Sequence, residues 1–260
     1  MTTQPIGIFD SGLGGLSIWK EIIKRLPQED TYYLADSKNA PYGVRSKEEI
    51  IALSKKNIDY LLNLHCKLIV VACNTATTNA IKELRANYNL PIIGIEPAIK
   101  PAALKTKTNV VGILATQGTL SSDLFHQTTN RFSSDITFIE QMGTGIVELI
   151  EKGETNSPAM EGLLKKYLDP MLAAHIDYLV LGCSHYPFLM PLLKKILPPE
   201  VHIIDSGEAV ANQTAAVLAQ FKLLNTQSTA THHLYTNTTL RGINSIVPDH
   251  PTIVKAIKMF

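Results

Sequence analysis

The sequence predicts an α/β protein made of two pseudo-symmetric, doubly wound domains with mainly parallel sheets and an active site in the cleft between them. Three observations lead to this fold class. Short apolar runs rich in β-branched residues recur along the 260 residues, helical patterns separate them, and landmarks of the first half return in order in the second. Such alternation favours parallel strands joined by right-handed crossovers.

Most of the candidate strands are apolar on both faces, which is typical of parallel strands buried between helices. They lie at residues 6–9, 31–35, 68–72, 92–95, 110–114, 136–139, 178–181 and 202–204, with a further one at 233–236. The remainder of residues 225–251 is rich in Thr, Asn and His and lacks a clear period, so no other element is predicted there.

Amphipathic helices are predicted between the strands. The apolar stripe of the first consists of Leu16, Trp19, Ile23 and Leu26. Residue pairs mark the starts of three others. Ser46 with Glu49 is a capping box, and Ser157 with Pro158 is an N-cap followed by proline. Asp205 with Glu208 opens an Ala-rich helix toward Leu224.

Two landmarks repeat between the halves. The strand around Gly7 resembles the strand around Gly112, and in each half a later strand runs directly into a cysteine, Cys73 or Cys183. We therefore expect two similar domains. Prolines after residue 96 and a helix start near residue 206 place the first domain at 1–97 plus 207–260 and the second at 98–206.

Composition excludes several classes of protein. The 24 Lys+Arg and 23 Asp+Glu residues give a formal charge of +1, too little to attract nucleic acid or an anionic membrane surface. The apolar runs are too short to span a bilayer, and the N-terminus shows no signal-peptide pattern. Three cysteines make no disulfide framework, so we expect reduced thiols and a cytoplasmic enzyme.

Polar residues follow three of the predicted strands, and ligands bind at the carboxyl ends of parallel strands. The three segments are Asp10-Ser11-Gly12, Cys73-Asn74-Thr75 and Cys183-Ser184-His185. Each leads into a helical pattern, whose N-terminus suits a carboxylate or phosphate. The glycines at 12, 14 and 15 with Asp36 also allow a nucleotide site, although serine at position 17 leaves the dinucleotide fingerprint incomplete.

The cysteines admit three chemistries. A redox disulfide lacks a C-x-x-C motif, and zinc held by Cys73, Cys183 and His185 lacks paired ligand spacing. The third is acid/base catalysis from two faces of one carbon, with Asp10 beside the first thiol and His185 beside the second. Cys66 precedes its strand and is predicted to be a buried structural residue.

Six stretches, in order between residues 6 and 224, closely resemble glutamate racemases of the aspartate/glutamate racemase superfamily. They are GIFDSGLGGL at 7–16, DSKNAPYGVRS at 36–46, VACNTA at 71–76, PIIGIEP at 91–97, GILATQGT at 112–119 and LGCSHYP at 181–187. The tail beyond 225 matches poorly, apart from residues 233–236. The chain departs from the family at Ser184, where relatives usually carry threonine.

The resemblance implies interconversion of L- and D-glutamate without a cofactor or metal, supplying D-glutamate for peptidoglycan. It implies that Cys73 and Cys183 are the catalytic acid/bases, with Asp10 and His185 as their partners. The substrate-binding residues it implies are Asp10, Ser11, Tyr42, Gly43, Asn74, Thr75, Ser184 and His185. Glu151 is expected near the site, and a homodimer is expected because dimers are common in the family.

Two alternatives remain at this point. A relative that acts on aspartate or a hydantoin would share these motifs and differ in its substrate. A two-lobed amino-acid-binding protein would bind glutamate tightly without exchanging its Cα proton.

Overall fold

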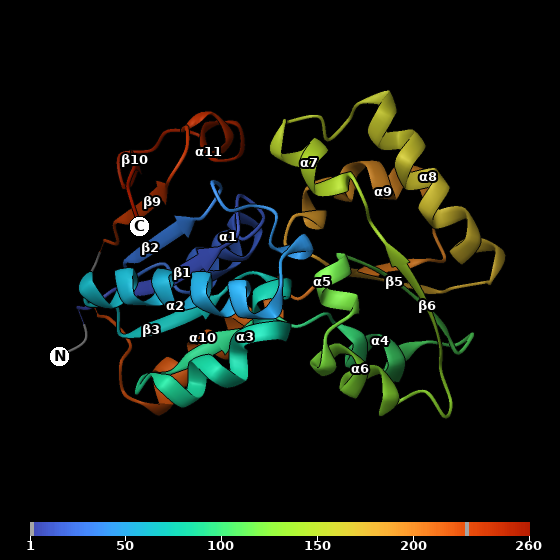
Figure 1. Cartoon of the computed structure of the whole chain (residues 1–260), viewed down its shortest axis with the longest axis horizontal. Helices are drawn as coiled ribbons and strands as arrows, with labels where there is room; N and C mark the ends of the chain where they lie inside the picture. The colour runs from blue at the N-terminus through green and yellow to red at the C-terminus, as the bar shows by residue number, and fades with distance from the viewer. Residues whose placement is uncertain (1–2, 227–228) are drawn as a thin grey trace.

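The computed structural model describes residues 3–226 and 229–260. Residues 1–2 belong to the N-terminus, where no signal-peptide pattern was found, and residues 227–228 belong to the tail that lacks a clear period; these four residues lie outside the described ones. Figure 1 shows two α/β domains side by side, each with a parallel sheet between helices. The predicted fold class is therefore confirmed.

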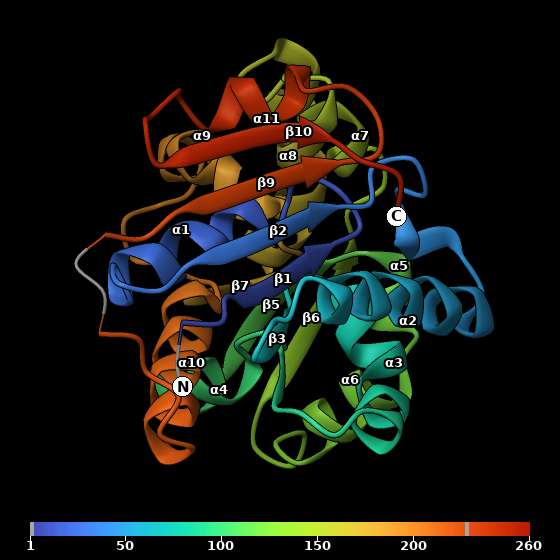
Figure 2. The ribbon, with the colours of Figure 1, turned by 90° about the vertical axis from the view of Figure 1, so that its left-hand side faces the viewer.

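The first domain contains a six-stranded parallel sheet in the order β10-β9-β2-β1-β3-β4. Figure 2 shows β10, β9, β2, β1 and β3 stacked in this order. Their bounds are β1 Ile6–Asp10, β2 Thr31–Ala35, β3 Leu68–Val71, β4 Ile92–Gly94, β9 His232–Thr236 and β10 Ile253–Ile257. The central strands are fully buried, as their two-faced apolar sequences predict.

Helices cover both faces of this sheet. One face packs against α1 (Leu16–Arg25), α10 (Gly207–Gln220) and α11 (Arg241–Ile246) around Trp19. The other packs against α2 (Lys47–Asn63) and α3 (Asn74–Asn87). The predicted capping box starts α2: Ser46 Oγ accepts from the backbone N–H of Glu49, and the Glu49 carboxylate accepts from the N–H of Ser46.

The second domain contains a four-stranded parallel sheet in the order β6-β5-β7-β8. Its strands are β5 Val110–Ala115, β6 Thr137–Met142, β7 Tyr178–Gly182 and β8 His202–Ile204. The helices are α4 Ile99–Lys105, α5 Gln117–Leu120, α6 Asp123–Asn130, α7 Ile146–Glu151, α8 Pro158–Ala173 and α9 Met190–Ile196, with 3-10 turns η1 Tyr42–Val44 in the first domain and η2 Tyr186–Leu189 in this one. Ser157 caps α8, as predicted.

The order β2-β1-β3-β4 in one sheet matches β6-β5-β7-β8 in the other. Gly7 on β1 pairs with Ile69, four residues before Cys73. Gly112 on β5 pairs with Leu179, four residues before Cys183. The two landmarks that repeat in the sequence therefore occupy equivalent places, and both cysteines follow a central strand at its carboxyl end.

Some expectations about single elements were wrong. The Ala-rich helix α10 begins at Gly207 and ends at Gln220, short of Leu224. β6 is an edge strand with three exposed residues rather than a strand buried on both faces. The tail contains α11 and β10, which its irregular composition did not predict. Over the described residues, no helix has the length and apolarity to cross a membrane.

Candidate active site

A small cavity lies where the carboxyl ends of the two sheets face each other. It has a volume of about 270 Å³. The lining residues are Ser11, Pro41, Tyr42, Gly43, Cys73, Asn74, Thr75, Thr116, Val147, Cys183, Ser184 and His185. The predicted site residues are thus brought together from both domains, with the exception of Asp10, which lies behind the lining.

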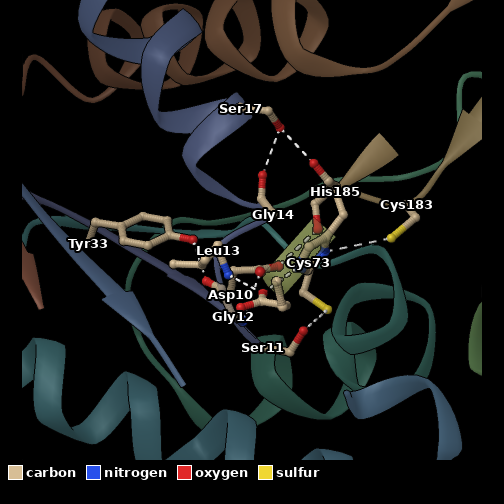
Figure 3. A network of polar contacts seen from close by, with 12 residues as sticks. Asp10, Ser11, Gly12, Leu13, Gly14, Ser17, Tyr33, Cys73, Cys183 and His185 are labelled. Atoms are coloured by element: carbon tan, nitrogen blue, oxygen red, sulfur yellow. Dashed lines mark hydrogen bonds and ion pairs between the residues drawn. The ribbon is translucent and has the colours of Figure 1, made fainter. Parts of the chain in front are cut away.

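Cys73 stands between β3 and α3 as the N-cap of the helix. Its Sγ accepts from the backbone N–H of Ala76 at 3.4 Å and lies 3.6 Å from Ser11 Oγ (Figure 3). Burial raises the pKa of the Cys73 thiol, and the nearby Asp10 charge raises it further, although the hydrogen bonds with Ala76 and Ser11 act in the opposite direction. The net shift favours the protonated thiol at neutral pH.

Cys183 faces a different set of groups. Sγ of Cys183 lies 3.8 Å from Nδ1 of His185, as the dashed line in Figure 3 shows, and Nε2 of His185 lies 2.6 Å from Oε1 of Glu151. The same Oε1 accepts the backbone N–H of Leu13 from the first domain at 2.8 Å. Contrary to expectation, no helix begins at Cys183: the 3-10 turn η2 starts at Tyr186, and α9 follows it from Met190.

The His185–Glu151 contact is a charged pair. Burial lowers the pKa of His185, but its hydrogen bonds to Cys183 and Glu151 outweigh burial and hold that pKa well above its ordinary value. Burial raises the pKa of Glu151, and the bond to His185 reverses this so that the net shift is downward. A protonated imidazole therefore lies between the Cys183 sulfur and a carboxylate.

Asp10 is completely buried at the end of β1. Its carboxylate accepts from the backbone N–H of Gly12 at 2.9 Å and from Ser184 Oγ of the second domain at 3.0 Å. Burial raises the pKa of Asp10 above its ordinary value, and the charge of His185 partly offsets that rise. Asp10 thus joins the two domains beneath the cavity, and the hydroxyl of Ser184 is directed to it.

Tyr42 lines the cavity, and its hydroxyl bonds to two side chains of the first domain. The hydroxyl donates to Asp36 Oδ2 at 2.6 Å and accepts from Asn57 Nδ2 at 3.1 Å. Gly43 places its backbone against Thr116 of the second domain, where an added Cβ would lie 3.1 Å from the Thr116 Cβ. These two residues therefore form a wall that approaches the opposite domain closely.

Asn74 is the unsatisfied group of the cavity. The residue is 2% exposed, and neither Nδ2 nor Oδ1 of its amide has a hydrogen-bond partner among the described residues. Buried amides in native proteins are almost always paired. An unpaired donor and acceptor at the wall of a cavity is the arrangement expected of a group that binds a polar ligand.

Sequence reasoning missed Thr116, Pro41 and Val147 in the cavity wall. Thr116 Oγ1 lies 2.9 Å from Thr75 Oγ1, so two hydroxyls from different domains meet at the cavity. A signal for Thr116 was available in the repeat, because it lies four residues after Gly112 just as Ser11 lies four residues after Gly7.

An outer pocket of about 430 Å³ lies next to the cavity. Pro41, Gly43, Thr116 and Val147 line both spaces, and Glu148 lines only the outer one. The η1 loop and the start of α7 therefore border both spaces.

The structure does not favour the nucleotide or zinc alternatives. Asp36, the residue placed for a ribose, is 2% exposed and accepts hydrogen bonds from Tyr42, Asn39 and Asn237. In the described part of the chain, no group of three His, Cys, Asp or Glu side chains is arranged to hold a metal ion.

The Asp/Glu/Hydantoin racemase family model matches residues 14–214, most of the chain and both sides of this cavity. The chain belongs to that family. A glutamate racemase of Herpetosiphon aurantiacus is 47% identical over 228 residues, covering 88% of this chain and 90% of the relative.

Solved structures of the Asp/Glu/Hydantoin racemase family share the whole fold. A glutamate racemase isoform of Bacillus anthracis matches with a TM-score of 0.90 at 28% identity, covering 100% of this chain and 98% of that one. A Francisella tularensis glutamate racemase in complex with D-glutamate matches with a TM-score of 0.86 at 28% identity, covering 100% and 98%. The two-domain architecture predicted from the sequence is thus that of the family.

Proposed function

We propose that this chain is a cofactor-independent glutamate racemase that interconverts L- and D-glutamate through two cysteine acid/bases. The observation that carries the proposal is a single cavity lined by the sulfur-bearing residues Cys73 and Cys183 from different domains, with the unpaired amide of Asn74 beside them. The likeness to glutamate racemases, one of them solved with D-glutamate, supports glutamate as the substrate.

The proton balance is simple. The sulfur on one side of Cα, as thiolate, takes the Cα proton and becomes a thiol, while the thiol on the other side gives its proton to the opposite face and becomes a thiolate. No electron pair leaves the substrate, and the product differs only in configuration. The two thiols therefore exchange protonation states in each turnover.

The protein must stabilise the negative charge that develops when the Cα proton leaves. Hydrogen-bond donors directed at the α-carboxylate can each supply about 3 kcal/mol of transition-state stabilisation. The cavity offers the amide of Asn74, the hydroxyls of Ser11 and Thr75, and backbone N–H groups at the start of α3. The small, mostly buried space also limits water, which strengthens these contacts.

We propose that His185 and Asp10 control the protonation of the two sulfurs, His185 that of Cys183 and Asp10 that of Cys73. His185 can pass a proton to or from Cys183 at 3.8 Å while Glu151 compensates the imidazolium charge. Burial and, after it, the charge of Asp10 raise the pKa of Cys73, which keeps a proton on this sulfur for delivery to the substrate. We also infer the domain boundaries: the first domain spans 1–97 together with 207–260, and the second spans 98–206.

The test is deuterium exchange at Cα in D₂O, with metals chelated and no cofactor added. Both L- and D-glutamate are expected to gain one deuterium and to change configuration. Cys73→Ser and Cys183→Ser are each expected to abolish inversion, and Cys66→Ala, a buried thiol outside the cavity lining, is the matched control. Folded protein that neither exchanges nor inverts glutamate contradicts the proposal, and inversion of aspartate or a hydantoin instead identifies the alternative relative.

By the same likeness we propose that the enzyme is a cytoplasmic homodimer and supplies D-glutamate for peptidoglycan. Growth of a D-glutamate auxotroph on expression of the chain tests the supply, and sedimentation of the purified protein tests the dimer. A lack of rescue by an active, expressed enzyme would reject the cell-wall role.

A further inference from the structure

The loop between β2 and α2, residues 36–45, forms part of the first domain's side of the cavity. Pro41, Tyr42 and Gly43 line the cavity, and Val44, which is 73% exposed, lines the outer pocket. Little of this loop is regular structure beyond the single 3-10 turn η1. Its position must therefore be fixed by side chains that hold it from outside the cavity.

Asp36 holds the loop at its first residue. Its buried carboxylate accepts from Tyr42 at 2.6 Å and from Asn39 Nδ2 at 2.8 Å, so two residues from the middle of the loop are tied to its first residue. Burial raises the pKa of Tyr42, and the charge of Asp36 raises it further, so the phenol stays neutral and remains a donor. Asn57 donates to the same phenol oxygen from α2.

Asn237 brings the tail of the chain to this network. It follows β9, and the parallel register pairs Thr236 with Ala35, so Asn237 stands across from Asp36. Its Nδ2 donates to Asp36 Oδ1 at 2.6 Å, and its Oδ1 accepts the backbone N–H of Lys38 at 2.8 Å. A primary amide can make both bonds at once, whereas a carboxylate lacks the donor and an alanine lacks both.

We propose that Asn237 is a positioning residue of the active site: it acts through Asp36 and Lys38 to hold the Tyr42–Gly43 wall of the cavity in place. The inference rests on the proposed racemase function and adds a residue from the tail of the chain. We expect this wall to touch the substrate and not the reacting sulfurs. Loss of Asn237 should therefore change the KM for glutamate more strongly than kcat.

The experiment compares Asn237→Ala with Asn212→Ala, an exposed asparagine on α10 that bonds to Arg25. For Asn237→Ala we expect the KM for both enantiomers to rise about tenfold and kcat to fall less than threefold, and for Asn212→Ala we expect wild-type values. Trypsin cleavage after Lys38 and Arg45, located by mass spectrometry, is expected to accelerate about tenfold in Asn237→Ala alone.

A swap tests the pairing itself. Asn237→Asp faces Asp36 with a second carboxylate, so it should lose at least as much kcat/KM as Asn237→Ala. The double variant Asp36→Asn/Asn237→Asp restores an amide–carboxylate pair and should recover several-fold over Asn237→Asp. This arm also serves if Asn237→Ala fails to fold.

The proteolysis arm separates this inference from the proposed function. A wild-type chain without racemase activity rejects the function, while the cleavage rates still show whether Asn237 holds the loop. Unchanged KM and unchanged cleavage after Lys38 and Arg45 in Asn237→Ala overturn the inference. So does a loss of activity that leaves the cleavage rates at the wild-type level, or a swap that recovers nothing.

Discussion

Gly14→Ala tests whether the position of His185 limits the rate. Gly14 lies where the first domain's glycine turn approaches the second domain. A methyl added there would lie 2.6 Å from Ser184 Oγ and 2.7 Å from Cε1 of His185, and closer still to Nδ1. Favourable carbon contacts need about 3.5 Å, so the imidazole must move by about 1 Å. That shift breaks its contacts with Cys183 and Glu151.

Misplacement of a catalytic group by about 1 Å can cost about 100-fold in rate, and overpacking typically costs about 1–3 kcal/mol of stability. We therefore expect kcat/KM for glutamate to fall about 100-fold, measured by circular dichroism of the two enantiomers well below the Tm. Gly162→Ala is the matched control, since nothing lies within 4 Å of its added methyl on the exposed face of α8. A folded Gly14→Ala enzyme with more than half of the wild-type kcat/KM would refute the argument.

Three further predictions concern stability. Folding lowers the pKa of Glu151 from 4.5 and raises the pKa of His185 from 6.5, so the ion pair stabilises the fold fully between pH 4.5 and 6.5. The stabilisation is lost as the pH falls through the folded-state pKa of Glu151 or rises through the folded-state pKa of His185. The Tm difference between wild type and Glu151→Gln should therefore be largest between pH 4.5 and 6.5. Lys67→Met leaves the buried carboxylate of Glu29 without the ion pair at 2.6 Å, and urea denaturation should show a loss of about 3–5 kcal/mol. Leu234→Ala on β9 removes a fully buried side chain and should cost about 2–5 kcal/mol, whereas a loss near zero would show that the tail is not part of the core.

The regular parts of the fold were predictable because their signals are local. Ser46 and Glu49 specify a helix start through bonds between residues three apart. The repeat of Gly7 and Gly112 identified equivalent central strands because a glycine there is required by close neighbours, Cys66 and Ile69 at the first and Met171 and Ile176 at the second. Each of these constraints involves short stretches of sequence, so it can be recognised without the structure.

The tail was not predictable for the opposite reason. β10 is an edge strand with Val254 43% exposed and Ile257 56% exposed, so it lacks the two-faced apolar pattern of the central strands. α11 has six residues and one buried side chain, Ile243, and no side-chain cap. Its stability comes from packing on Leu13 and the first domain's core, which the local sequence does not encode.

The site divides in the same way. The strand-end rule located both cysteines and the residues beside them, because their positions follow from the strands. The direction of a hydroxyl does not follow from the strands: Ser184 is turned to Asp10, and Tyr42 is turned to Asp36. The bond from Leu13 to Glu151 joins residues 138 apart in the sequence, and only the folded chain brings them together.

The strand order of the first sheet has a consequence for synthesis of the protein. β2 (Thr31–Ala35) leaves the ribosome early, yet its outer neighbour β9 (His232–Thr236) comes near the end of the chain. Until then one row of backbone N–H and C=O groups on β2 has no strand to pair with, and such an edge can recruit another polypeptide. Pairing of β9 with β2 therefore removes this exposed edge, and with it a route to self-association, only late in synthesis.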